Sequence, residues 1–232
     1  MKKIILLTTI AIFSICNFSF IGTDFEGKIV YTVDVDNPNM PPEAKAMMAG
    51  SELNIYIKGT KTRSDMNMGF QNTTTIADSK TKTSVMLMEV MGNKYKIITD
   101  QNKKETDKAP DVSVKYLDET KEIAGYKCKK AEITFKDKSG NSRVTNIYYS
   151  EEITNHLGND NRSAQFKDLK GMPLEYEIVA DRGMTMKMMA KSVSKESVAD
   201  SKFDIPSGYK ETTIEDMQKE MMKMMQEGGG QH

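Results

Sequence analysis

The sequence predicts a mainly β protein with a few helices, built on one antiparallel sheet that stays open or forms an incomplete barrel. Apolar and polar residues alternate with a period of two through most of the chain, as in strands that bury one face. These runs are short, and residues that favour tight turns separate them. Many short strands with few helices favour this architecture over an α/β fold.

The first half of the chain is expected to be a series of strands joined by tight turns. Ile29, Tyr31, Val33 and Val35 alternate with charged and hydroxyl side chains, which predicts a strand at about 27–36. Further strands are expected at about 53–57, 61–68, 72–78, 82–90 and 94–99. The turn residues between them are Gly59, Asp78-Ser79 and Gly92-Asn93.

Two hairpins are expected in the second half of the chain. Apolar residues alternate with charged ones at 131–135, a turn sequence follows at 138–141, and 144–149 forms the returning strand. A second hairpin is expected between 174–178 and 184–188, across an Asp-Arg-Gly turn. The polar stretch between the two hairpins is expected to be a loop with one helical turn at most.

Two helical segments are expected. A short one follows Pro41-Pro42 and ends at Gly50. A longer amphipathic helix is expected at 213–227, where Thr213 and Asp216 resemble a capping box. Its apolar stripe consists of Ile214, Met217, Met221, Met224 and Met225. We expect this stripe to plug the sheet, with an exposed partner-binding helix as the alternative, and residues 228–232 to be disordered.

The N-terminal segment 1–22 has the features of a signal peptide. Two lysines precede an apolar and hydroxyl run at 4–15, which is shorter than the roughly 20 residues that cross a bilayer. Cleavage is expected between residues 16 and 22, with periplasmic or secreted location and no permanent transmembrane anchor. Lipidation of Cys16 is the alternative, although Ile15 is not the small residue that precedes a lipidated cysteine.

The remaining chain of about 210 residues is expected to form a single domain at 23–212, followed by the C-terminal helix. The 33 basic residues balance 33 acidic ones without a basic cluster, so no nucleic-acid partner is expected. We expect a monomer. Once the signal peptide is removed, Cys128 has no partner for an intramolecular disulfide.

No motif for catalysis or for cofactor binding is present, so we expect neither an enzyme nor a bound cofactor. Signatures of serine hydrolases, zinc peptidases, redox dithiols and phosphate-binding loops are all missing from the sequence. Cys128 lies between Lys127 and Lys129, and nearby positive charge can activate a thiol. Because no base accompanies it in the pattern, we expect a packed and chemically quiet side chain.

Methionine is unusually frequent, with 19 residues against no tryptophan. Because residues two apart in a strand share a face, Met-x-Met runs place their thioethers on one surface. The runs that fall in predicted strands supply Met66, Met68, Met86, Met88, Met184, Met186 and Met188. Three interpretations stay open: ordinary core filling, an adaptable cavity for an apolar ligand, and Cu(I) binding by thioethers.

Two segments resemble a family of secreted bacterial proteins, domain of unknown function 4412. They are the stretch EIAGYKCKKA at 122–131 and the stretch FDIPSGYK at 203–210. The resemblance spans most of the chain and implies a fold like that of the outer-membrane lipoprotein carriers of the Lol type. Such a fold is a strongly curved antiparallel half-barrel with helices covering its concave face. The resemblance implies no activity, and the methionines are not part of the family pattern.

These observations lead to one main hypothesis and two alternatives. The main hypothesis is a non-catalytic envelope protein that holds an apolar ligand, an acyl chain or a lipoprotein, in a methionine-lined half-barrel. The first alternative is a periplasmic protein that binds Cu(I) or handles oxidants at the same methionine pairs. The second is a structural envelope protein with a closed core and no ligand.

Overall fold

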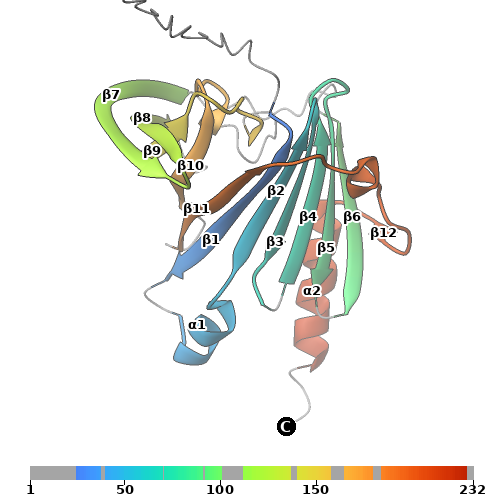
Figure 1. Cartoon of the computed structure of the whole chain (residues 1–232). Coiled ribbons are helices and arrows are strands. Elements are labelled where there is room, and N and C mark those ends of the chain that lie inside the picture. The colour runs from blue at the N-terminus through green and yellow to red at the C-terminus, as the bar shows by residue number, and fades with distance from the viewer. Residues whose placement is uncertain are drawn as a thin grey trace, which may run out of the picture.

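The computed structural model describes residues 25–37, 40–69, 71–90, 92–100, 112–136, 140–157, 165–179 and 184–228. This part of the chain forms one twelve-stranded sheet with two α-helices (Figure 1). The strands are β1 (Gly27–Asp36), β2 (Glu52–Lys58), β3 (Lys61–Asn67), β4 (Gln71–Asp78), β5 (Thr83–Val90), β6 (Asn93–Asp100), β7 (Val112–Ile123), β8 (Tyr126–Lys136), β9 (Ser142–Ser150), β10 (Met172–Val179), β11 (Thr185–Lys195) and β12 (Lys210–Glu211). The helices are α1 (Pro42–Met48), the 3₁₀ turn η4 (Asp200–Phe203) and α2 (Ile214–Gly228).

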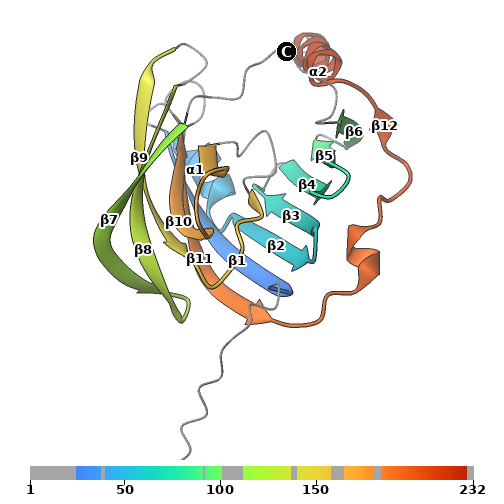
Figure 2. The ribbon, with the colours of Figure 1, turned by 90° about the horizontal axis from the view of Figure 1, so that it is seen from above.

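The sheet consists of two meanders that meet where β1 pairs with β11. Strands β1 to β6 lie side by side in chain order, and so do β7 to β11. The pairs within and between the meanders are antiparallel, whereas short β12 runs parallel to β6. Figure 2 shows that the sheet curls into an open arch, with β7 and β12 at its two edges. The predicted mainly β fold with an open, curved antiparallel sheet is confirmed.

Both expected hairpins are present, as β8–β9 and β10–β11. The alternation of apolar and polar residues did not predict β7, although β7 pairs with β8. From Asp118 to Glu122 its side chains are charged or hydroxyl and exposed, so no apolar alternation marks this stretch as a strand. Backbone pairing at an edge of the sheet therefore takes the place of side-chain burial in β7.

The main core lies on the inner face, which is the side of the sheet toward the inside of the arch in Figure 2. Ile29, Tyr31 and Ile55 are fully buried there, and Ile29 lies directly opposite Ile55. The Tyr31 hydroxyl donates to the carbonyl of Pro173 at 2.8 Å, which satisfies a buried polar group. The connection between β9 and β10 contributes further buried side chains, Ile153, Phe166 and Leu169.

Residues 196–209, which we call the strap, cross the outer face of the first meander between β11 and β12 (Figures 1 and 2). Lys58 Nζ lies 2.9 Å from the carbonyl oxygen of Val198 and 2.9 Å from Asp200 Oδ1. Phe203 and Val198 are buried against Ile76 of β4. The strap therefore fastens the outer sides of β2 to β4 before the chain reaches the edge at β6.

Helix α2 packs on the inner face over β5 and β6, because Met217 is buried against Tyr95 and Ile97. Its start is capped as expected: the Asp216 amide donates to Thr213 Oγ1 at 3.1 Å. Helix α1 has no buried side chain and lies beyond the ends of β1 and β2 (Figure 1). Of the two helices, α2 is thus the one that covers part of the concave face.

The predicted signal peptide at 1–22 lies outside the described residues, as do residues 229–232 of the expected disordered tail. Helix α2 extends to Gly228, one residue beyond the expected helix end. No helix in the described ranges combines the length and the apolar character needed to cross a membrane.

Candidate functional site: the methionine-bearing inner face

The strand register places the methionine pairs on the inner face. Met66 lies opposite Leu53, and Met186 and Met188 lie opposite Val35 and Val33. On the other flank of the arch, Met86 and Met88 lie opposite Ile97 and Tyr95. Among these five methionines Met188 is fully buried, and the other four are half-buried.

Apart from Met172, which is fully buried within the main core, the methionines of this face form two groups. The first contacts the main core and consists of Met40, Met48, Met66, Met68, Met184, Met186 and Met188. The second packs with Val90, Tyr95 and Ile97 between the sheet and α2, and consists of Met86, Met88, Met217 and Met221. The side chains of Met224 and Met225 lie outside the described residues. The structure thus brings nine of the eleven predicted methionines onto one face.

Two members of the first group, Met40 and Met48, were not predicted as site residues. They flank the helical segment α1, outside any Met-x-Met run. The signal that could have found them is their position: α1 connects β1 to β2, so both methionines lie at the end of these two strands. Half-buried Met40 and Met48 extend the methionine surface toward one open end of the arch.

The register bears on the Cu(I) alternative. Soft thioether ligands select Cu(I), and a site needs several of them within bonding distance. In the described strands, Met66 and Met88 both lie opposite Thr73 of the intervening β4, so these two methionines sit two strands apart. Met186 and Met188 are flanked by β1 and β10, whose facing residues are not methionine. Direct cross-strand neighbours therefore do not assemble a thioether site there.

Tyr95 is a polar group buried within the second methionine group. Its side chain is 1% exposed, and its hydroxyl has no hydrogen-bond partner among the described residues. A buried hydroxyl without a partner costs about 1–3 kcal/mol. Helix α2 and the sheet therefore bury Tyr95, and none of the described residues accepts a hydrogen bond from its hydroxyl group.

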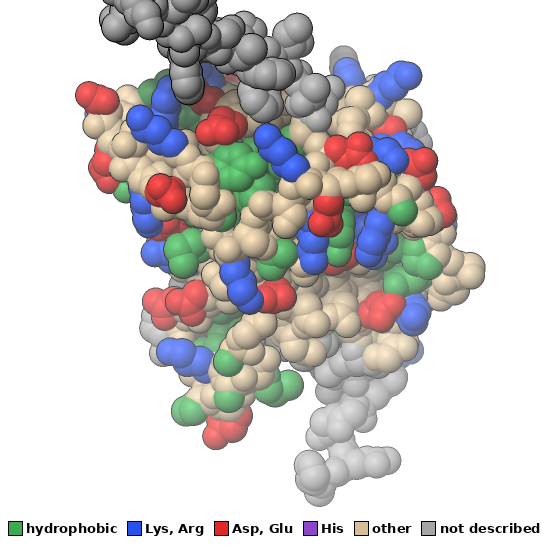
Figure 3. Space-filling model, in the orientation of Figure 1, with side chains coloured by type: hydrophobic (Ala, Val, Ile, Leu, Met, Phe, Trp, Pro, Cys, Tyr) green, Lys and Arg blue, Asp and Glu red, His purple; other side chains and the backbone are tan. Residues whose placement is uncertain are grey.

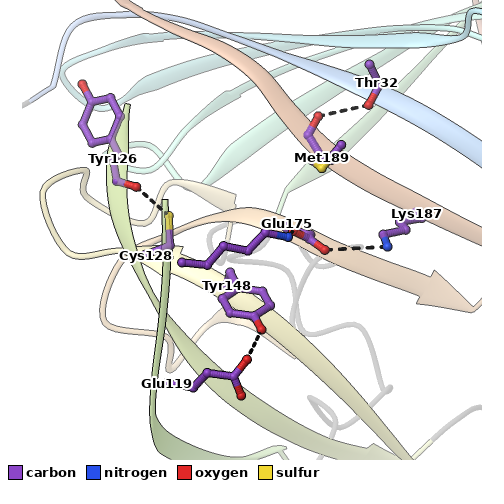
Figure 4. Close-up of polar contacts among 9 residues, drawn as sticks. Thr32, Glu119, Tyr126, Cys128, Tyr148, Glu175, Lys187 and Met189 are labelled. Carbon is purple, nitrogen blue, oxygen red and sulfur yellow. Dashed lines mark hydrogen bonds and ion pairs between the residues drawn. The ribbon is translucent and has the colours of Figure 1, made fainter. Parts of the chain in front are cut away.

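Cys128 is fully buried, and its thiol makes a 3.6 Å contact with the carbonyl of Tyr126 (Figure 4). Burial, followed by the carboxylates of Glu152 and Glu175, raises the pKa of Cys128 to about 11. The thiol is therefore protonated at neutral pH, which agrees with the expected low reactivity.

The charged residues near Cys128 pair with one another. Glu175 accepts from Lys121 at 2.6 Å and lies 3.7 Å from Lys187 (Figure 4). Tyr148 donates to Glu119, and the hydrogen bonds from Lys130 and then Tyr148 lower the pKa of that carboxyl group. These contacts are typical of a solvated sheet face in which charges are mutually compensated.

Comparison with known proteins gives the family. The model of the family described as "Domain of unknown function (DUF4412)" matches residues 43–209. The chain belongs to this family. The match runs from α1 to Tyr209 at the end of the strap, so this DUF4412 domain includes most of the arch and the outer crossing.

Among solved structures, the crystal structure of MucB is similar to this DUF4412 chain. The two are 11% identical, the alignment has a TM-score of 0.34, and it covers 79% of this chain. The chain spans 57% of the MucB chain. A comparison with curated proteins gave no significant match.

Proposed function

We propose that this protein is an exported, non-catalytic, monomeric binding protein that holds an acyl chain, a lipoprotein or another apolar ligand on its inner face. The observation that carries the proposal is the position of the methionines. Residues from β3, β5, β11 and α2 share one face, and most of them remain half-buried. Unbranched thioether side chains change rotamer easily, so such a surface adapts to apolar ligands of different shape.

Helix α2 occupies part of the face that this ligand would use. Met217 is buried against the sheet, but Ile214 and Met222 on the same helix are 41% and 53% exposed. Beneath the helix, the Tyr95 hydroxyl has no partner among the described residues. A ligand with an ester or amide carbonyl could replace the apolar contacts of α2 and also accept a hydrogen bond from Tyr95. The geometry therefore supports α2 as a displaceable plug.

The test is a titration of the purified, delipidated protein with a fluorescent fatty acid. Replacing Met88 with Lys adds a charge to the inner face and is expected to weaken fatty-acid binding at least about tenfold, because burying an unpaired charge is costly. Met189→Lys is the matched control, since Met189 is 43% exposed and therefore accommodates the charge in solvent. Circular dichroism of both variants establishes that the sheet has formed.

A second variant separates the apolar-ligand proposal from its alternatives. Leucine at all seven strand-associated methionines keeps the volume and apolar character, at less than about 1.5 kcal/mol for each packed site, but removes the thioethers. Fatty-acid binding is expected to persist in this variant. Cu(I) binding by the natural chain that disappears in the variant, without fatty-acid binding by either, would favour the Cu(I)- or oxidant-handling alternative. Binding of neither ligand would favour a structural protein.

Export is tested separately by the intact mass of protein recovered from the cell envelope. We expect a mature N-terminus between Asn17 and Thr23, without lipid. A diacylglyceryl mass on Cys16, or an uncut chain, would contradict export as a soluble periplasmic protein.

A further inference from the structure

The outer face carries a polar recess that the inner-face proposal does not use. The recess has a volume of about 410 Å³ and lies across β2 to β5, with Tyr209 at the end of the strap on its border. The outer face of these strands is toward the viewer in Figure 1, and Figure 3, in the same orientation, shows basic and acidic side chains distributed over it. A smaller recess of about 200 Å³ shares Asn54 and Asn67 and extends toward α1. Together they form a groove in the size range of small-molecule sites, roughly 300–1,000 Å³.

The register of β2 to β5 places the residues of this groove side by side. Asn54, Asp65, Thr74 and Leu87 lie directly opposite one another on four successive strands. The next row consists of Asn67, Asn72 and Glu89. Leu87 is 2% exposed, so it is buried beneath the polar residues of the groove.

The charged groups of the recess are compensated within it. Arg63 Nε donates to both carboxylate oxygens of Asp65, at 2.8 and 2.9 Å, and Arg63 Nη1 donates to the carbonyl of Lys202 at 3.0 Å. Glu89 lies 3.0 Å from Lys94 Nζ and accepts the hydrogen bond of Tyr209. Burial and the Glu89 carboxylate raise the pKa of Tyr209 to about 12, so its hydroxyl stays protonated. Arg63, Asp65 and Glu89 each already have a partner of opposite charge, so they do not offer an unpaired charge to an anion or a metal cation.

The polar groups that remain available are amides. The side chains of Asn54 and Asn72 make no hydrogen bond within the described ranges, and Asn67 uses only its oxygen, which accepts from the Gly69 amide at 2.9 Å. An amide side chain both donates and accepts hydrogen bonds, as does a hydroxyl group. A ligand with many neutral hydroxyl groups and an apolar C–H face matches three amides beside the half-buried ring of Tyr209.

We propose that this outer groove binds a neutral saccharide of one or two rings. The amides of Asn54, Asn67 and Asn72 would bond to its hydroxyl groups, and its ring would lie beside the half-buried Tyr209. Met66 also borders the recess, but the three asparagines alternate along their strands with the inward residues and lie on the opposite side of the sheet from the methionine pairs. The saccharide site therefore does not depend on the apolar-ligand proposal.

The test uses ¹H–¹⁵N spectra of the full mature chain during titration with N-acetylglucosamine, maltose and inorganic phosphate. Saturable shifts at Asn54, Asn72, Leu87 and Tyr209 are expected with at least one of the two sugars at millimolar concentrations. Shifts confined to the inner face, or stronger saturation with phosphate, would overturn the neutral-saccharide assignment. The absence of saturable shifts with both sugars would overturn the site itself.

The Asn54→Ala, Asn72→Ala double variant is expected to weaken sugar binding about tenfold or more, as for the loss of two ordinary hydrogen bonds. Asn146→Ala is the matched control, because this exposed asparagine lies on distant β9 and should leave binding unchanged. Fatty-acid binding should be the same in all three proteins. Equal sugar affinity in the double variant and the control would place the sugar elsewhere.

Discussion

The centre and the flank of the inner face differ although they belong to one continuous sheet. At the centre, Ile29 of β1 and Ile55 and Ile57 of β2 are fully buried. On the adjacent flank, the inward residues of β3 and β4 are small, hydroxyl-bearing, amide or methionine, and all are half-buried: Thr62, Ser64, Met66, Gln71, Thr73, Thr75 and Ala77. The isoleucines at the centre are large, apolar and fully buried, whereas the flank residues are smaller or, in the case of Met66, flexible, and they leave part of the face accessible. We therefore expect the side chains of β3 and β4 to adapt to a ligand more easily than the tightly packed side chains of β1 and β2.

The largest expected difference is in stability. Ile55→Ala at the centre should lower the free energy of unfolding by about 2–5 kcal/mol, since it removes a fully buried side chain and leaves a cavity. Met66→Ala on the flank should lower it by roughly half as much or less, because Met66 is only half-buried. Urea denaturation of both variants measures the contrast. Equal losses would show that the flank is packed as tightly as the centre.

The buried thiol of Cys128, on β8 in the main core, predicts a pH effect. Because burial raises the pKa of Cys128 to about 11, the folded state keeps its proton at pH values where the unfolded thiol, with a pKa of about 8.5, has lost it. The stability advantage of the thiol is therefore complete below about pH 8 and lost as the pH rises to 11. The difference in unfolding free energy between the natural chain and Cys128→Ala should shrink by up to about 2–3 kcal/mol over this interval. Denaturation at several pH values measures it; a constant difference would contradict burial as the cause.

Two tyrosines give the smallest and most direct comparison. Tyr31 at the centre donates to Pro173, so Tyr31→Phe should lower the free energy of unfolding by about 1 kcal/mol. Tyr95 on β6, beyond the flank, buries its hydroxyl without a partner among the described residues, so Tyr95→Phe should raise that free energy by about 1 kcal/mol. Calorimetry of both variants should show shifts of opposite sign. A loss of stability in Tyr95→Phe would mean that its hydroxyl is satisfied in solution.

The features that depend on local periodicity could be predicted from the sequence alone. Alternation located most strands of both meanders, and the same period placed members of each Met-x-Met run on one face. The assembly of Met66, Met88 and Met186 onto one surface could not be predicted, because it depends on the order of strands in space. Strand β7 was missed because pairing with β8, and not apolar alternation, holds most of its length.

The outer groove could not be predicted from the sequence, for a related reason. Asn54, Asp65 and Thr74 come from three strands and become neighbours only through the register of two hairpins. Tyr209 reaches the same place through the strap, which crosses the sheet from a distant part of the chain. The segment around Tyr209 supported the family resemblance, but sequence comparison alone gave no indication of which face it covers.

The way the sheet ends at its two edges has a consequence for solubility. An unprotected edge strand is a template on which another copy of a chain can add its own strand, which leads to aggregation. At one edge, β12 and the Thr212 amide occupy part of the β6 backbone. At the other, β7 carries exposed charges such as Lys115 and Glu119, and its register with β8 is broken between Tyr116 and Thr120. Both edges thus discourage strand-to-strand association, so the protein can present an apolar inner face without also offering its backbone for self-assembly.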